Sequence, residues 1–452
     1  MNNRVWRLTT VSTLALVSLV FLTACVCWPS LPTLIHQNGC ARIYPSQEKQ
    51  YAAPPPKSYI AHIHNQDVWI MEEDGTQKKQ LTESAEREFS LSASERAERI
   101  WFIRSDSPSA STNLYGDVYS CDYEGKNVRQ VTKGLMVKFV AVSIDGKKLA
   151  ISVIGQMKPA IDGGNSETAD MYIISASADK LSTLADTVDL TSDLTTSDVG
   201  GREGSTFLAW SPDSKRVAFT YKADGSASLG ISTKSVYLAD ADGDNREKLI
   251  DSCDEPRFNV DGTGTMLAVT YGSHWDTTGV MQVSVDGDFS EDVLPMPTGS
   301  PLYSAYAPFW LSTYNSDVHK NVVYSKQTHP ADASQITNTL EMYNLETKKT
   351  TILATMSTPS EIISKTDSDA LGTYLVFQAG VSDPVSGKAA EIWRLKPDGT
   401  DLIKLSGEED DSEPTFAVSY SWYNKGKTGG TTNPYGCHWP YENYPKNYNG
   451  AL

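Results

Sequence analysis

Three short stretches of the chain bring together residue types that can do chemistry. His62 and His64 alternate along an extended segment, so both imidazoles would lie on one face, as two ligands of a metal do. The stretch "DADGDN" at 240–245 places three aspartates at alternate positions, a pattern of oxygen ligands that suits Ca²⁺. The stretch "GSHWD" at 272–276 contains the three residue types of a nucleophilic triad.

An ordinary structural explanation is favoured for each stretch. The chain has only 7 histidines, and no third ligand accompanies His62 and His64 in the sequence. The three aspartates lack the glutamate that completes an EF-hand loop, so we expect a turn. Neighbouring residues of a strand rarely face one another as a triad must, and no G-x-S-x-G stretch is present. We therefore predict no catalytic residue, no metal site and no cofactor, and leave open whether the protein is an enzyme.

A repeated unit must position these residues. In "AWSPDSKRVAFTYKADG", 209–225, a Pro-Asp turn precedes a strand with alternating apolar residues. The stretch 235–250 adds a second strand, an Asp-Gly turn and a third strand. The same order recurs from 143, 259 and 367, and less regularly from Glu95 and Trp310. No segment between these strands has a convincing helical period.

Tandem units of short strands predict an all-β propeller, because one small sheet cannot bury both faces without neighbours. The first unit, 59–82, lacks an opening strand, while 413–422 is an opening strand without followers. Pairing these two segments would close the ring and hide both edges. We predict seven blades, with six as the alternative.

The repeat resembles that of the TolB-type propeller family, in which "W-S-P-D-G-x-x-I-A-F" precedes "I-Y-x-x-D-x-D-G" and a terminal "L-T". The matching residues here are Trp210, Ser211, Pro212, Asp213, Val217, Ala218, Phe219, Asp240, Asp242 and Gly243, with Leu81, Thr82, Val131 and Thr132 at repeat ends. The resemblance implies the fold but no activity. TolB itself has six blades behind an α/β domain, so membership of the Tol system is not implied.

The first residues have the layout of an export signal: two arginines, an uncharged apolar run, and small residues before Cys25. The stretch Leu22–Cys25, "LTAC", resembles the lipobox of bacterial lipoproteins. That resemblance implies a signal peptide over 1–24 and lipid attachment at Cys25, which would hold the protein on a membrane. A plain secretory signal cut near Ala24 is the alternative. Val26 after the cysteine favours the outer membrane, on its periplasmic or surface side.

The sequence divides the remainder into a Pro-rich spacer at 25–57, a propeller at 58–423 and a tail at 424–452. We hypothesise that Cys40 and Cys437, which flank the propeller, form a disulfide. The tail is rich in Gly, Asn and aromatic residues, and could either bind a partner or pack on the propeller. Its candidate contact residues are Tyr435, Trp439, Tyr441, Tyr444 and Tyr448.

The net charge of the chain limits the classes of partner that it can bind. A formal net charge of -17 argues against binding nucleic acid, whose phosphates an acidic surface repels. The leading hypothesis is a cell-envelope lipoprotein whose propeller is an interaction scaffold for an envelope protein. The alternative is a carbohydrate-active enzyme, a hydrolase or lyase with its site in the propeller channel and a glycan as its ligand. A structural lipoprotein of an envelope assembly is a third hypothesis.

Overall fold

The computed structural model describes residues 57–419, apart from 95, 106–114, 155–157, 160–164, 167–168, 192–207, 223–233, 260–263, 275–276, 312–319, 331–335, 357–360, 370–371, 381–389 and 407–410. Within these ranges every regular element longer than a turn is a β-strand. The strands form seven four-stranded antiparallel sheets and one small hairpin. The fold is therefore an all-β propeller with seven blades, as the repeat predicts.

The blades are lettered A to G, and their strands run from the innermost outward. Blade A contains β30 (Asp411–Ser419), β1 (Lys57–His64), β2 (Asp67–Glu72) and β3 (Lys79–Gln80), and blade B contains β4 (Arg87–Ser94), β5 (Arg99–Ser105), β6 (Asp117–Asp122) and β7 (Arg129–Gln130). Blade C contains β8 (Val137–Val142), β9 (Lys148–Ile154), β12 (Ala169–Ser175) and β13 (Val188–Asp189), and blade D contains β14 (Leu208–Trp210), β15 (Arg216–Lys222), β16 (Lys234–Asp240) and β17 (Glu247–Asp251). Blade E contains β18 (Cys253–Phe258), β19 (Met266–His274), β20 (Thr277–Ser284) and β21 (Ser290–Leu294), and blade F contains β22 (Leu302–Trp310), β23 (Asn321–His329), β24 (Thr337–Asn344) and β25 (Lys349–Met356). Blade G contains β26 (Ile363–Ser368), β27 (Leu375–Ala379), β28 (Glu391–Leu395) and β29 (Ile403–Lys404), and the hairpin is β10 (Lys158–Pro159) with β11 (Asn165–Ser166).

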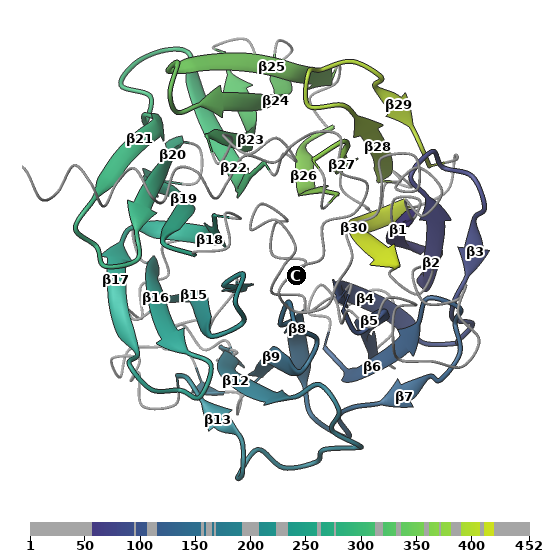
Figure 1. Ribbon diagram of the computed structural model, residues 1–452. Coiled ribbons are helices and arrows are strands. Elements are labelled where there is room, and N and C mark those ends of the chain that lie inside the picture. The colour runs from purple at the N-terminus through teal and green to yellow at the C-terminus, as the bar shows by residue number, and fades with distance from the viewer. Residues whose placement is uncertain are drawn as a thin grey trace, which may run out of the picture. The chain divides into compact units, whose positions relative to one another are not determined.

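The blades follow one another around a ring with their first strands at the centre (Figure 1). Because the strands of a blade alternate in direction, two kinds of connection share one end of the ring: those from second to third strand, and those from one blade to the next. We call this the loop end. The connections from first to second and from third to fourth strand share the opposite end, which we call the turn end.

The ring closes through strands from opposite ends of the described chain. Strand β30 pairs antiparallel with β1, from Lys57 opposite Ser419 to His64 opposite Asp411, with one irregularity beside His62. The chain thereby supplies blade A with its innermost strand last and its other three strands first. This is the closure that the incomplete first and last repeats predict.

Apolar side chains fill all seven seams between neighbouring blades. Seven clusters of buried residues are present among the described residues, and each joins the facing sides of two consecutive blades. The seam between blades B and C is the largest, and it contains Trp101, Ile103, Leu149 and Ile151 with less than 2% exposure. A blade therefore obtains its hydrophobic stabilisation from its two neighbours, which explains why the units must occur in tandem.

Two short motifs of the repeat make local hydrogen bonds. In the turn from first to second strand, the Ser211 hydroxyl donates to Asp213 over 2.7 Å and accepts from the Arg216 backbone over 2.9 Å. At the repeat end, the Thr82 and Thr132 hydroxyls accept from the backbone N–H groups of Val68 and Val118, each over 2.9 Å. These hydroxyls satisfy backbone donors that no strand pairs with, so serine and threonine recur at these positions.

Candidate functional site

The seven blades permit an internal comparison, because matched positions have the same surroundings unless a residue is specialised. One such position lies near the middle of the second strand. In blades B to F it is the fourth residue of that strand. In blades A, B, E, F and G it lies opposite the irregularity of the innermost strand. Six blades place a large apolar or aromatic residue there, with 0% exposure, in the seam with the preceding blade: Phe102, Ile151, Phe219, Val269, Tyr324 and Phe377. In blade A the residue is His62.

His62 is a buried imidazole at a position where the other six blades have an apolar or aromatic side chain. Its exposure is 1%, and burial lowers its pKa to about 3, with smaller contributions from the charges of Lys78 and His64. Its Nε2 lies 3.8 Å from an Asp411 carboxylate oxygen, beyond hydrogen-bond distance. Its Nδ1 makes no hydrogen bond within the described chain, and the Ile60 backbone offsets only a small part of the lowering of the pKa. The ring is therefore neutral at physiological pH.

His64, two residues further along β1, is held by the same carboxylate. Its Nδ1 lies 2.5 Å from an oxygen of Asp411, whose side chain is 2% exposed. The Asp411 backbone N–H donates to the Ala390 carbonyl of blade G, so the aspartate sits directly in the closing seam. The acidic stretch 407–414, "GEEDDSEP", has a composition typical of a solvated loop, but the structure buries Asp411 at the start of β30.

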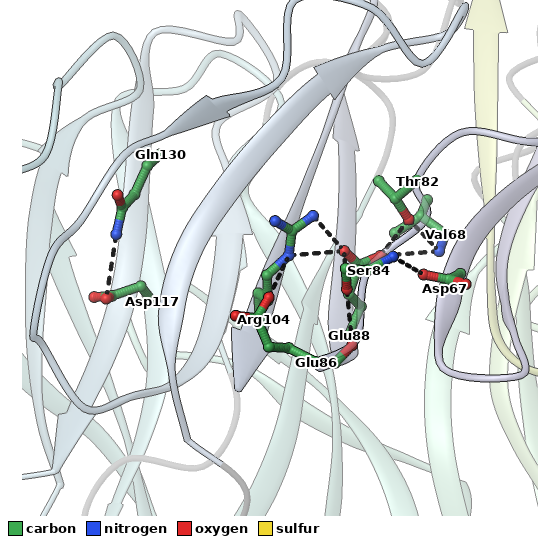
Figure 2. Close-up of polar contacts among 9 residues, drawn as sticks. All are labelled: Asp67, Val68, Thr82, Ser84, Glu86, Glu88, Arg104, Asp117 and Gln130. Carbon is green, nitrogen blue, oxygen red and sulfur yellow. Dashed lines mark hydrogen bonds and ion pairs between the residues drawn. The ribbon is translucent and has the colours of Figure 1, made fainter. Parts of the chain in front are cut away.

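Blade B has the counterpart of this pair at the same register. Glu88 is opposite Arg104 in the β4–β5 pairing, as Asp411 is opposite His64 in the β30–β1 pairing. One Glu88 oxygen accepts from Arg104 over 2.7 and 3.0 Å, while the other accepts from the Thr82 hydroxyl and from the Val68 backbone over 3.0 Å. Figure 2 shows this carboxylate between the guanidinium of its own blade and the donors of blade A.

The Glu88 cluster has the properties of a structural lock between blades. Burial raises the pKa of Glu88, and the four donors offset part of that effect. The Arg104 guanidinium also covers the Tyr119 ring at 4.4 Å from its centroid. Both oxygens of the buried Glu88 carboxylate have partners, and the partners on blade A help to fix the relative position of blades A and B.

Blade F carries a third polar departure from the apolar pattern. Glu341, with 4% exposure, accepts from the Tyr324 hydroxyl over 3.1 Å and from the Thr339 hydroxyl over 3.0 Å, and pairs with Lys326 at 3.3 Å. Tyr324 takes the position of His62, and Lys326 that of His64. Blades A and B thus share one arrangement, with a carboxylate of the innermost strand opposite a basic residue of the second strand, whereas in blade F the carboxylate is on the third strand and its partners are all within the blade.

The remaining sequence candidates are placed as follows. The stretch 240–245 is a turn at the end of β16, in which the Asp240 carboxylate accepts from Asn245 over 2.6 Å. The 272–276 stretch spans the end of β19 and two residues outside the described chain. No group of three or more metal-ligating side chains is present among the described residues. Nor do those residues form a helix of the length and hydropathy that crossing a bilayer requires.

Several predicted residues lie outside the described part of the chain. These are the lipid-attachment residue Cys25, the proposed disulfide partners Cys40 and Cys437, and the tail residues Tyr435, Trp439, Tyr441, Tyr444 and Tyr448. They stay predictions.

Comparison with known proteins yields structural neighbours alone. No protein-family model matches the chain, and no curated protein matches it in sequence. The solved structures it resembles include TolB from Acinetobacter baumannii, with 15% identity over 82% of this chain and 70% of that chain and a TM-score of 0.43. They also include an oligogalacturonate lyase in complex with manganese, with 13% identity over 71% of this chain and 84% of that chain and a TM-score of 0.47. A third is the periplasmic gluconolactonase of Pseudomonas aeruginosa, with 10% identity over 80% of this chain and 99% of that chain and a TM-score of 0.49. Likeness at these levels assigns no function.

The buried His62 predicts a specific acid sensitivity. The imidazole is neutral in the folded protein and protonated in the unfolded chain between about pH 3 and pH 6.5, so folding stability falls as the pH is lowered across that window. The substitution His62→Phe installs the residue that blades B, D and G have at the matched position, and should remove this pH-dependent loss of stability. We expect the free energy of unfolding of the variant, relative to wild type, to increase by about 2–3 kcal/mol between pH 6.5 and pH 4.5.

Urea unfolding at several pH values measures this difference, with Ile151→Val as the control. Ile151 occupies the matched position of blade C, and its substitution adds or removes no titrating group. Its difference from wild type should stay constant with pH. A His62→Phe difference that is equally constant would contradict the account of the buried neutral imidazole.

Proposed function

We propose that the protein is a cell-envelope lipoprotein whose propeller is a rigid scaffold that binds another envelope protein at the loop end. The lipid at Cys25 would hold it on a membrane, with the outer membrane favoured, and the tail residues from Tyr435 to Tyr448 would add contacts to the same partner. The observation that carries the proposal is the uneven distribution of connections between the two ends of the ring.

Long connections between the second and third strands occur at the loop end of four blades. In blades B, C, D and G these strands are joined by 106–116, 155–168, 223–233 and 380–390, and the second of these includes the hairpin β10–β11. Blade A joins the equivalent strands through two residues, Asn65 and Gln66. Such a turn is sufficient for a blade to form, so the extra length in the four blades is not needed for folding. Loops of this kind on a rigid framework are the usual location of binding surfaces.

The seams support the scaffold function by making that framework rigid. Glu88 of blade B accepts from Val68 and Thr82 of blade A, and the Asp411 backbone of blade A donates to Ala390 of blade G. Contacts of this kind fix the blades relative to one another, so a partner would bind a preformed surface at small conformational cost.

Shortening one loop tests the proposal. Replacing 155–168 by Asn-Gly, a two-residue turn like that of blade A, should leave the fold intact because the flanking strands β9 and β12 remain paired. Crosslinking in the native membrane, followed by affinity capture, should recover an envelope protein with wild type and at least about tenfold less of it with the variant.

Two controls accompany this experiment. Replacing 312–319, a connection at the turn end, by Asn-Gly should leave capture unchanged. The substitution Cys25→Ala should move the chain from the membrane fraction to the soluble fraction, which tests the anchor separately. Equal capture by both loop variants would contradict a binding surface at the loop end of blade C.

The alternative function, a carbohydrate-active enzyme, has one observation in its favour. Glu255 is a half-buried carboxyl on the innermost strand β18, and burial and the charge of Asp254 raise its pKa. The Asp254 carboxylate beside it pairs with Lys234 at 2.5 Å. A carboxyl of raised pKa next to a second carboxylate is the kind of pair that acid–base cleavage of a glycoside uses.

Incubation of the purified protein with envelope glycans distinguishes the two functions. The scaffold account expects no turnover by wild type. Turnover that is lost in Glu255→Gln and retained in Asp213→Asn, a surface carboxyl in a turn, would replace the scaffold proposal by the enzymatic one.

A further inference from the structure

The innermost strands carry an unusual set of exposed residues. A residue in the middle of such a strand packs its side chain against a neighbouring blade or directs it toward the ring axis. Among the innermost-strand side chains that the structure describes, four are exposed. One is Leu302, the first residue of β22, and the others are Lys138, Arg257 and Lys365.

Apart from Leu302 at the start of β22, the exposed described residues of these strands are therefore all cations, although lysine and arginine make up only 39 of the 452 residues. None of the three forms an ion pair or a side-chain hydrogen bond among the described residues. The innermost strands of a protein with a net charge of -17 thus carry three exposed positive charges.

The carboxylates of the same strands are already engaged. Glu255 accepts from the Thr270 hydroxyl over 2.8 Å and from the Ala307 backbone over 2.6 Å, and the charge of Arg257 favours its ionised form. Asp367 is half-buried and accepts from the Ser368 backbone over 2.9 Å. The exposed charged side chains described on the innermost strands are consequently positive.

The three cations also approach one volume from different sides. They belong to blades C, E and G, which are separated by other blades around the ring, and Figure 1 shows β8, β18 and β26 on different sides of its centre. Arg257 pairs with Ala268 at the register of the Ala141–Ala150 pair, so Lys138 lies about three residues before that level on its strand. Asp367 pairs with Val376 at the same level, so Lys365 lies about two residues before it. At about 3.4 Å per residue the three lie within roughly 10 Å along their strands, a span that long flexible side chains cover.

We propose that the ring axis is a binding site for a compact multivalent oxyanion, held jointly by Lys138, Arg257 and Lys365. Charges that converge from several sides favour a small ligand on the axis over an extended one on the surface. Phosphate groups and clustered carboxylates share the required chemistry, because both present several negative oxygens to ammonium and guanidinium donors. The inference rests on the innermost strands and does not depend on the binding of a protein at the loop end.

Calorimetric titration of the purified full chain with tripolyphosphate, citrate and acetate tests the proposal. We expect one site per chain for tripolyphosphate or citrate, no measurable binding of acetate, and weaker binding at higher ionic strength. Tripolyphosphate binding without citrate would identify a phosphate ligand, and the reverse a polycarboxylate. Each of Lys138→Gln, Arg257→Gln and Lys365→Gln should weaken binding about fivefold to tenfold, and the triple variant should abolish it.

A matched triple variant controls for net charge. Lys133→Gln, Lys215→Gln and Lys349→Gln remove the same charge from exposed lysines outside the innermost strands, and should leave binding unchanged. Thermal unfolding of both triple variants verifies that each is folded. Equal weakening by the two triple variants, or no binding of either anion to wild type, would overturn the proposal. Binding of poly-aspartate alone would overturn it in favour of a macromolecular ligand.

Discussion

The pairing of β30 with β1 is the interaction on which the rest of the structure depends. A four-stranded blade cannot bury both of its faces alone, so each blade needs a neighbour on either side. In an open row the first and last blades would lack one neighbour and would present unpaired strand edges. Closing the ring removes both defects, and the closing pair joins Lys57 to Ser419 and His64 to Asp411, residues from opposite ends of the described chain. The seven seams, the loop end and the arrangement of strands around the axis all depend on this pairing of β30 with β1.

The closing seam differs from the others in composition. Among the described side chains, its apolar cluster has Ile60, Met71, Val376, Ile392 and Leu405 as buried members, and His62 replaces the apolar residue that other blades place at the matched position. The Asp411–His64 contact and the backbone pairing of β30 accompany this cluster. Polar contacts are directional, whereas apolar packing tolerates sliding. The polar contacts of the closing seam therefore help to specify the register of the last strand.

Much of the fold could be predicted from the sequence because the repeat is local. Each unit contains its own turns and alternating strands, and the two incomplete units indicate the closure. The site was harder to predict, because its residues are brought together only by the ring. His62 and His64 attract attention by their spacing, but Asp411 lies 347 residues from His64 within a run of acidic residues that is typical of solvated loops. Glu88 and Arg104 are likewise ordinary charged residues until the β4–β5 register places them opposite each other.

The most direct test of ring closure is a disulfide across the closing pair. Tyr59 and Ala417 are register partners, whereas Thr415 pairs with Ala61. The double variant Tyr59→Cys/Ala417→Cys should therefore form an intramolecular disulfide, detectable by peptide mapping without reduction, and should unfold at a higher temperature than its reduced form. The offset variant Tyr59→Cys/Thr415→Cys should remain reduced, because diagonal neighbours are too far apart for that bond. Absence of the disulfide in the first variant, or equal formation in both, would contradict a ring closed by β30 and β1.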